Sequence, residues 1–95
     1  MNLDDLRNKI DKIDEGILRL FEERMDVVSQ VAMYKKANNI PVLDSGREAE
    51  KLQAISGKVM PQLEPLAHIL FTNLFELSRS HQNSMLESAV KNTDS

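Results

Sequence analysis

The chain has 95 residues, of which 41% are apolar, and it carries a net charge of −3 and no cysteine. This length suits one domain with a modest core, and the lack of cysteine excludes disulfides and thiolate chemistry. The acidic balance and the scarcity of aromatic side chains argue against a nucleic-acid partner. Because the sequence shows neither a membrane-spanning apolar run nor an apolar signal segment, we expect a cytoplasmic protein with no membrane partner.

The first predicted element is one long helix from Asp4 to about Ala37. A helix of this length spans ~50 Å, whereas a compact domain of this size is about 30 Å across. The helix must therefore extend beyond its own chain, and a second copy must cover its apolar seam. A heptad numbered from Leu3 is apolar or aromatic at every a and d position except Arg24. These apolar seam residues are Leu3, Leu6, Ile10, Ile13, Ile17, Leu20, Val27, Val31 and Tyr34.

A short extended connector that contains Pro41 separates this helix from a second one. Asp44 precedes the second helix, and Ser45 and Glu48 have the spacing of a capping box. Gly57 marks the end of the helix. Its predicted apolar stripe consists of Leu52, Ile55 and Val59.

A loop over residues 58–64 leads to a third helix, predicted from about Pro65 to Glu87. Beyond a domain over residues 1–88, residues 89–95 are predicted to be a polar tail or the stub of a linker. The predicted fold class is therefore all-α, with one long and two shorter helices per chain and an intertwined homodimer. One face of the third helix carries Leu66, Ile69, Leu70, Leu74 and Leu77, and a second strip carries Ala67, Phe71, Ser78, Gln82 and Met85.

Five polar side chains fall where the packing patterns call for apolar ones. Each has a structural interpretation: Arg24 could fix the helix register, and Lys35 could extend from the helix end to solvent. Glu48 could complete its capping box, Ser78 could bond back to its own helix, and Gln82 could face solvent. Together they favour a small, anionic, oxygen-rich ligand in a pocket between helices.

The sequence offers no sign of a metal or a cofactor. His68 and His81 are 13 residues apart, outside the spacing of a zinc-binding helix, and no glycine-rich phosphate loop is present. No arrangement of side chains suggests a nucleophile. Cations and neutral donors suit a reaction that needs positioning and electrostatic stabilisation without proton transfer.

One set of spaced residues has a known counterpart. It consists of Arg7, Arg24, Val31-Ala32-x-x-Lys35, Pro41-Val42-x-Asp44-x-x-Arg47-Glu48 and Ser78-x-x-x-Gln82. Over about residues 3 to 88 the chain thereby resembles the all-helical, type II chorismate mutases (the AroQ class), either free-standing or as the N-terminal domain of a bifunctional enzyme. The resemblance implies an intertwined dimer with two equivalent sites. It also implies a cofactor-free rearrangement of chorismate, a dianion, to prephenate in phenylalanine and tyrosine biosynthesis.

The resemblance implies that Arg7 and Arg24 hold the two substrate carboxylates and that Ser78 assists one of them. Arg7 and Arg24 are 17 residues apart, ~25 Å along a helix, too far to grip one small molecule from the same chain. If both bind substrate, Arg7 comes from the partner chain. Arg7 could also be an ordinary exposed charge.

The family pattern assigns the remaining residues to the ether oxygen and to the ring hydroxyl. Lys35 and Gln82 would be the catalytic pair, bonding the ether oxygen as negative charge grows there. Glu48 and the backbone near Asp44 would take the ring hydroxyl, and Arg47 would line the pocket.

Two other functions remain open. Isochorismate–pyruvate lyases share this fold and act on a similar dianion. A helical dimerisation module without catalysis would use Arg24 only to fix the register, and Arg24→Leu would then stabilise the dimer.

Overall fold

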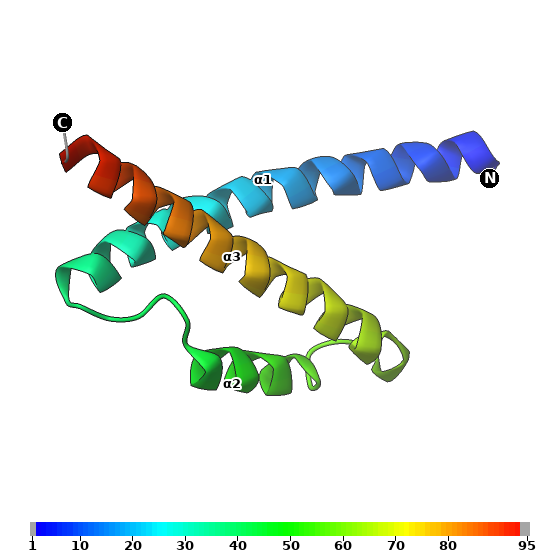
Figure 1. Ribbon diagram of the computed structural model, residues 1–95. Helices are drawn as coiled ribbons and strands as arrows, with labels where there is room; N and C mark the ends of the chain where they lie inside the picture. Colours follow the sequence, from blue (N-terminus) through cyan, green and yellow to red (C-terminus); the bar gives the residue numbers. More distant parts are fainter. Residues whose placement is uncertain (1, 94–95) are drawn as a thin grey trace.

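The computed structural model describes the backbone of residues 2–93 and the side chains of residues 2–87. Within this range the chain is helical, as predicted, and Figure 1 shows α3 crossing the C-terminal part of α1 while α2 lies against α3. No helix of the described range is long and apolar enough to cross a membrane. The elements are α1 (Leu3–Ala37), α2 (Ser45–Ile55), the short 3-10 helix η1 (Pro61–Leu63) and α3 (Glu64–Thr93).

Helix α1 has well-defined caps at both ends. Asn2 and Asp5 form a capping box, in which the Asp5 N–H donates to Asn2 Oδ1 over 2.9 Å. At the other end Asn39 adopts a left-handed conformation with φ of 55°, and the Ile40 N–H donates to the Lys35 carbonyl over 2.8 Å. This is a Schellman turn, and it ends the helix where the sequence predicted.

The N-terminal half of α1 extends well beyond the rest of the chain (Figure 1). The molecule measures 59 × 30 × 15 Å, and its radius of gyration of 17.2 Å exceeds the ~13 Å of a compact domain of about this size. The predicted overhang is therefore present. All nine apolar seam residues are exposed in the single chain.

A different face of α1 packs within the chain, and only towards its C-terminal end. Ala32 is fully buried there, and Met25 and Val28 are half-buried, whereas the seam residues beside them stay exposed. The expectation that the seam packs along its whole length is thus not met by this chain alone.

Two details of the predicted second helix are wrong. Asp44, and not Ser45, is the N-cap of α2, because its side chain accepts from the Arg47 N–H over 3.0 Å. The helix ends at Ile55, so Val59 lies beyond it and does not belong to its stripe. Ile55 itself is buried, as predicted.

Helix α3 begins at Glu64 with Pro65 in its first turn, close to the prediction. It continues past the predicted end at Glu87 to Thr93, because the intervening sequence contains neither glycine nor proline. The backbone of most of the predicted tail is therefore helical, and residues 94–95 lie outside the described range. The division into a domain and a tail stays a prediction.

The two faces of α3 differ in burial. Ser78 and Gln82 of its second strip are buried, and so is Phe75, which neither predicted strip included, whereas Leu66 and Ile69 of its more apolar face are exposed. Four of the five residues of that apolar face are exposed, and such exposure of large apolar side chains to water is unfavourable.

Both histidines make hydrogen bonds that connect elements. His81 Nε2 lies 2.8 Å from Ser29 Oγ and joins α3 to α1. His68 Nε2 lies 3.1 Å from Ser56 Oγ and joins α3 to the end of α2. These contacts give both side chains a structural role.

Candidate active site

All three helices contribute side chains to one cavity of about 490 Å³, a volume typical of small-molecule sites. Its apolar wall comes from valines of α1 and two phenylalanines of α3. Its polar lining residues are Arg24 from α1, Arg47, Glu48 and Lys51 from α2, and Ser78 and Gln82 from α3.

Arg24 projects from α1 towards α3, where its guanidinium donates to Ser78 Oγ. Ser78 in turn donates to the Leu74 carbonyl over 2.7 Å, so it bonds back to its own helix, as its structural interpretation predicted. Burial lowers the pKa of Arg24, but a guanidinium stays protonated in proteins. The cavity thus contains a partly desolvated cation whose side-chain partner is a neutral hydroxyl.

Gln82 is buried at the cavity wall with only 6% of its surface exposed. The alternative in which it faces solvent is therefore wrong. Its Oε1 atom has no hydrogen-bond partner among the described residues. Buried polar atoms are nearly always paired, so this oxygen is an acceptor that is free to bind a donor in the cavity.

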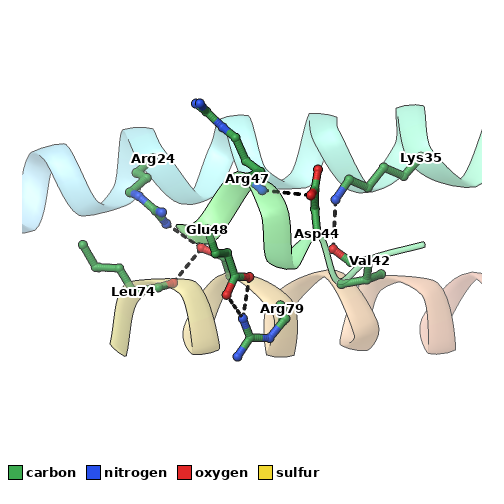
Figure 2. Close-up of polar contacts among 9 residues, drawn as sticks. Arg24, Lys35, Val42, Asp44, Arg47, Glu48, Leu74 and Arg79 are labelled. Atoms are coloured by element: carbon green, nitrogen blue, oxygen red, sulfur yellow. Dashed lines mark hydrogen bonds and ion pairs between the residues drawn. The ribbon is translucent and has the colours of Figure 1, made fainter. Parts of the chain in front are cut away.

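Glu48 does not complete a capping box; both of its carboxylate oxygens accept from Nη1 of Arg79 on α3 (Figure 2). The two side chains are 25% and 28% exposed, so the pair is largely removed from water. Arg79 lies outside both strips predicted for α3, and it was missed because no spacing links residues 31 positions apart.

Lys51 is a second residue that the sequence pattern did not single out. It follows Glu48 by three positions and Arg47 by four, so one face of α2 carries all three to the cavity. This helical spacing was available in the sequence, but Lys51 belongs to no part of the family motif.

Lys35 and Asp44 lie beside the cavity and do not line it. The Lys35 ammonium donates to the Val42 carbonyl over 2.9 Å, which fastens the connector to α1 (Figure 2). The Asp44 carboxylate caps α2, and its carbonyl accepts from the Glu48 N–H over 3.1 Å. Both residues therefore shape the connector at the start of α2.

Arg7 is exposed on the N-terminal half of α1 and does not line the cavity. The helix rise puts it ~25 Å from Arg24 along the axis. Of the eight predicted site residues, the single chain therefore brings five to the cavity lining. These are Arg24, Arg47, Glu48, Ser78 and Gln82.

Known proteins resemble this chain in sequence. The family model described as chorismate mutase type II matches residues 6–83. The bifunctional chorismate mutase/prephenate dehydratase of Aquifex aeolicus is 39% identical over 74 residues, which are 70% of this chain and 20% of that protein. The T-protein of Haemophilus influenzae is 40% identical over 52 residues, which are 55% of this chain and 14% of that protein. No solved structure matches the chain significantly.

Proposed function

The chain belongs to the type II chorismate mutase family, and we propose that it converts chorismate to prephenate in the biosynthesis of phenylalanine and tyrosine. The family match over residues 6–83 confirms the resemblance found in the sequence. One observation carries the proposal: Arg24, a partly desolvated cation, lies in a cavity of suitable size beside neutral donors. That cavity suits a small dianion in a reaction without proton transfer.

The active unit in this proposal is an intertwined homodimer. Support comes from the exposed seam of α1, from the exposed apolar face of α3 and from the extended shape of the chain. A second copy would bury both surfaces, and a two-fold arrangement would build two equivalent sites. It would also bring Arg7 of one chain towards the cavity of the other.

Arg24 and the partner's copy of Arg7 would each hold one carboxylate of chorismate, with Ser78 assisting. Ser78 supports this role because it already accepts from Arg24 and so fixes the direction of the guanidinium. Holding both carboxylates selects the compact conformer in which the two bonding carbons approach each other. This proximity effect lowers the barrier without any covalent step.

Gln82 and Lys35 would donate to the ether oxygen, where negative charge develops as the C–O bond breaks. Gln82 supports this role because its side chain is buried at the cavity wall and because its neutral amide NH2 group can donate to an ether oxygen. An ammonium has three donors, and Lys35 uses one for the Val42 carbonyl. Donors aimed at the developing charge stabilise the transition state more than the ground state.

Glu48 would accept from the ring hydroxyl, together with the backbone near Asp44. Arg47 would complete the positive wall of the cavity. These roles are consistent with the helix N-cap, which sets the direction in which the first turn of α2 presents Glu48.

The direct test follows the loss of chorismate absorbance with purified protein and identifies prephenate as the product. Isochorismate is assayed beside it, so that lyase activity is seen if present. Arg24→Leu should abolish the activity, whereas Arg19→Leu, an exposed arginine of the same helix, should retain it. Two results together would instead identify a dimerisation module: the wild type has no activity, and the Arg24→Leu protein is stable and associates more tightly than the wild type.

A further inference from the structure

The ion pair of Glu48 and Arg79 is the feature of the site that the proposed function leaves unexplained. Among the residues whose side chains the structure describes, it is the one salt bridge. Glu48 lines the cavity and Arg79 does not, so Arg79 contacts the carboxylate from behind the wall. Figure 2 shows the two side chains directed at each other across the gap between α2 and α3.

A carboxylate is an awkward lining group for a site that takes a dianion. Three cations, Arg24, Arg47 and Lys51, attract such a ligand, whereas the charge of Glu48 repels it. The partial removal of the pair from water makes this repulsion stronger than it would be in bulk solvent. The site therefore needs the acceptor capacity of Glu48 without its full negative charge.

The contact between Arg79 and Glu48 can preserve the acceptor capacity of Glu48 while it offsets the negative charge. Nη1 of Arg79 donates to both oxygens of Glu48, which occupies part of the lone-pair capacity of each. An ionised carboxylate has about four acceptor sites, so acceptor positions remain for a hydroxyl. The same contact places a positive charge next to the carboxylate and offsets its field in the cavity.

The position of Lys51 suggests a second role for the ion pair of Glu48 and Arg79. It stands three residues after Glu48 on α2, at the spacing that favours an ion pair along one helix. No such pair is present between these two described side chains, because Glu48 is held by Arg79, and Lys51 remains part of the cavity lining. Arg79 therefore preserves the positive potential of the wall.

We propose that Arg79 is a positioning residue that holds the Glu48 carboxylate against α3 and offsets its charge, so that Glu48 accepts the substrate hydroxyl without repelling the substrate carboxylates. This inference rests on the proposed function of the cavity. It assigns to Arg79 an effect on substrate binding and none on the bond-breaking step. The net charge of the substrate and its two carboxylates are the same in the ground state and the transition state, so Arg79 should affect the binding of both states about equally.

The test compares steady-state kinetics of Arg79→Ala, Arg79→Gln and Arg79→Lys in the full chain. Loss of the charge should raise KM about tenfold or more with a much smaller change in kcat. Arg79→Lys should keep KM close to the wild-type value, because one ammonium can also donate to both oxygens. Arg79→Gln retains side-chain bulk, so it serves where Arg79→Ala does not fold.

A double-mutant cycle with Glu48→Gln separates the charge effect from a packing effect. Glu48→Gln removes the repelling charge, so Arg79→Gln should cost little more once Glu48→Gln is present. Lys58→Ala is the matched control, because it removes one positive charge from an exposed position outside the cavity. Its KM should stay close to that of the wild type.

The possible outcomes differ clearly. The inference is overturned if the wild type is active and the Arg79→Gln variant has the same KM as the wild type. It is also overturned if Arg79→Gln lowers kcat by as large a factor as it raises KM. The same holds if Arg79→Gln raises KM as much in the Glu48→Gln background as it does in the wild type. A wild-type protein that does not convert chorismate would overturn the proposed function, and this inference with it.

Discussion

The position of Arg7 makes a quantitative prediction about mixed dimers. Arg7 lies ~25 Å along α1 from Arg24, and the cavity that Arg24 lines does not include it. If each site combines Arg24 of one chain with Arg7 of the other, Arg7→Ala and Arg24→Ala should each inactivate the protein. A mixture of the two variants should recover part of the activity.

The expected recovery follows from counting sites. When the two variants are unfolded together, mixed equally and refolded, about half of the dimers pair one variant with the other. In such a dimer one site carries both substitutions and the other carries neither. About one quarter of the wild-type activity should therefore return, with an unchanged KM for the restored sites.

The assay is the loss of chorismate absorbance before and after mixing, at protein concentrations where the dimer persists. In the control, each variant is unfolded and refolded alone. It should stay inactive, which excludes that the refolding procedure itself restores activity. If both arginines served the same site from one chain, every site in a mixed dimer would lack one of them. Activity that stays absent after verified chain exchange would therefore refute the shared site.

Four further predictions concern Lys35, Gln82 and Ile13. Lys35→Ala should lower kcat far more than Ser78→Ala, because a charged donor to the ether oxygen is typically worth ~3–4 kcal/mol in kcat. The wild-type rate should be nearly flat from mildly acidic to mildly alkaline pH, because the Gln82 amide donates without titrating. Gln82→Glu should be active only at low pH, where the carboxyl is protonated and can donate. Ile13→Glu should convert dimer to monomer in sedimentation experiments, since each of two chains loses ~1.5–3 kcal/mol of apolar burial.

Each of these expectations has a clear contrary result. Equal, modest losses in Lys35→Ala and Ser78→Ala would contradict the ranking. Full activity of Gln82→Glu at pH values of about 8 would remove Gln82 from the ether oxygen, since an ionised carboxylate cannot donate. A dimeric Ile13→Glu protein would show that the seam of α1 is not the interface.

The long helix was the most predictable element, because its evidence is local and repeated. A heptad over more than thirty residues, acidic residues at its start and proline after its end all favour the same interpretation. The second helix was less predictable at its ends. Asp44 and Ser45 are both good N-cap residues, and only the observed bond to the Arg47 N–H distinguishes them.

The partners of the site residues were the least predictable feature. A polar residue in an apolar pattern was enough to single out Arg24 and Gln82, since a buried polar group needs a reason. The partner of Glu48 was not visible, because Arg79 lies on another helix and in no pattern of its own. Lys35 shows the same limit: its bond to the Val42 carbonyl depends on the path of the connector, which no periodicity describes.

The exposed seam and the cavity are two parts of one surface, and this explains why a lone chain leaves its site so open. Val27 and Val31 line the cavity although they are seam residues, and they are 56% and 39% exposed. Arg24 lies between them and the face of α1 that packs against α3. A second copy that covers the seam would therefore also exclude water from beside Arg24. Lower local polarity strengthens the attraction between a cation and an anionic ligand, so association of the chains and binding of the substrate should reinforce each other.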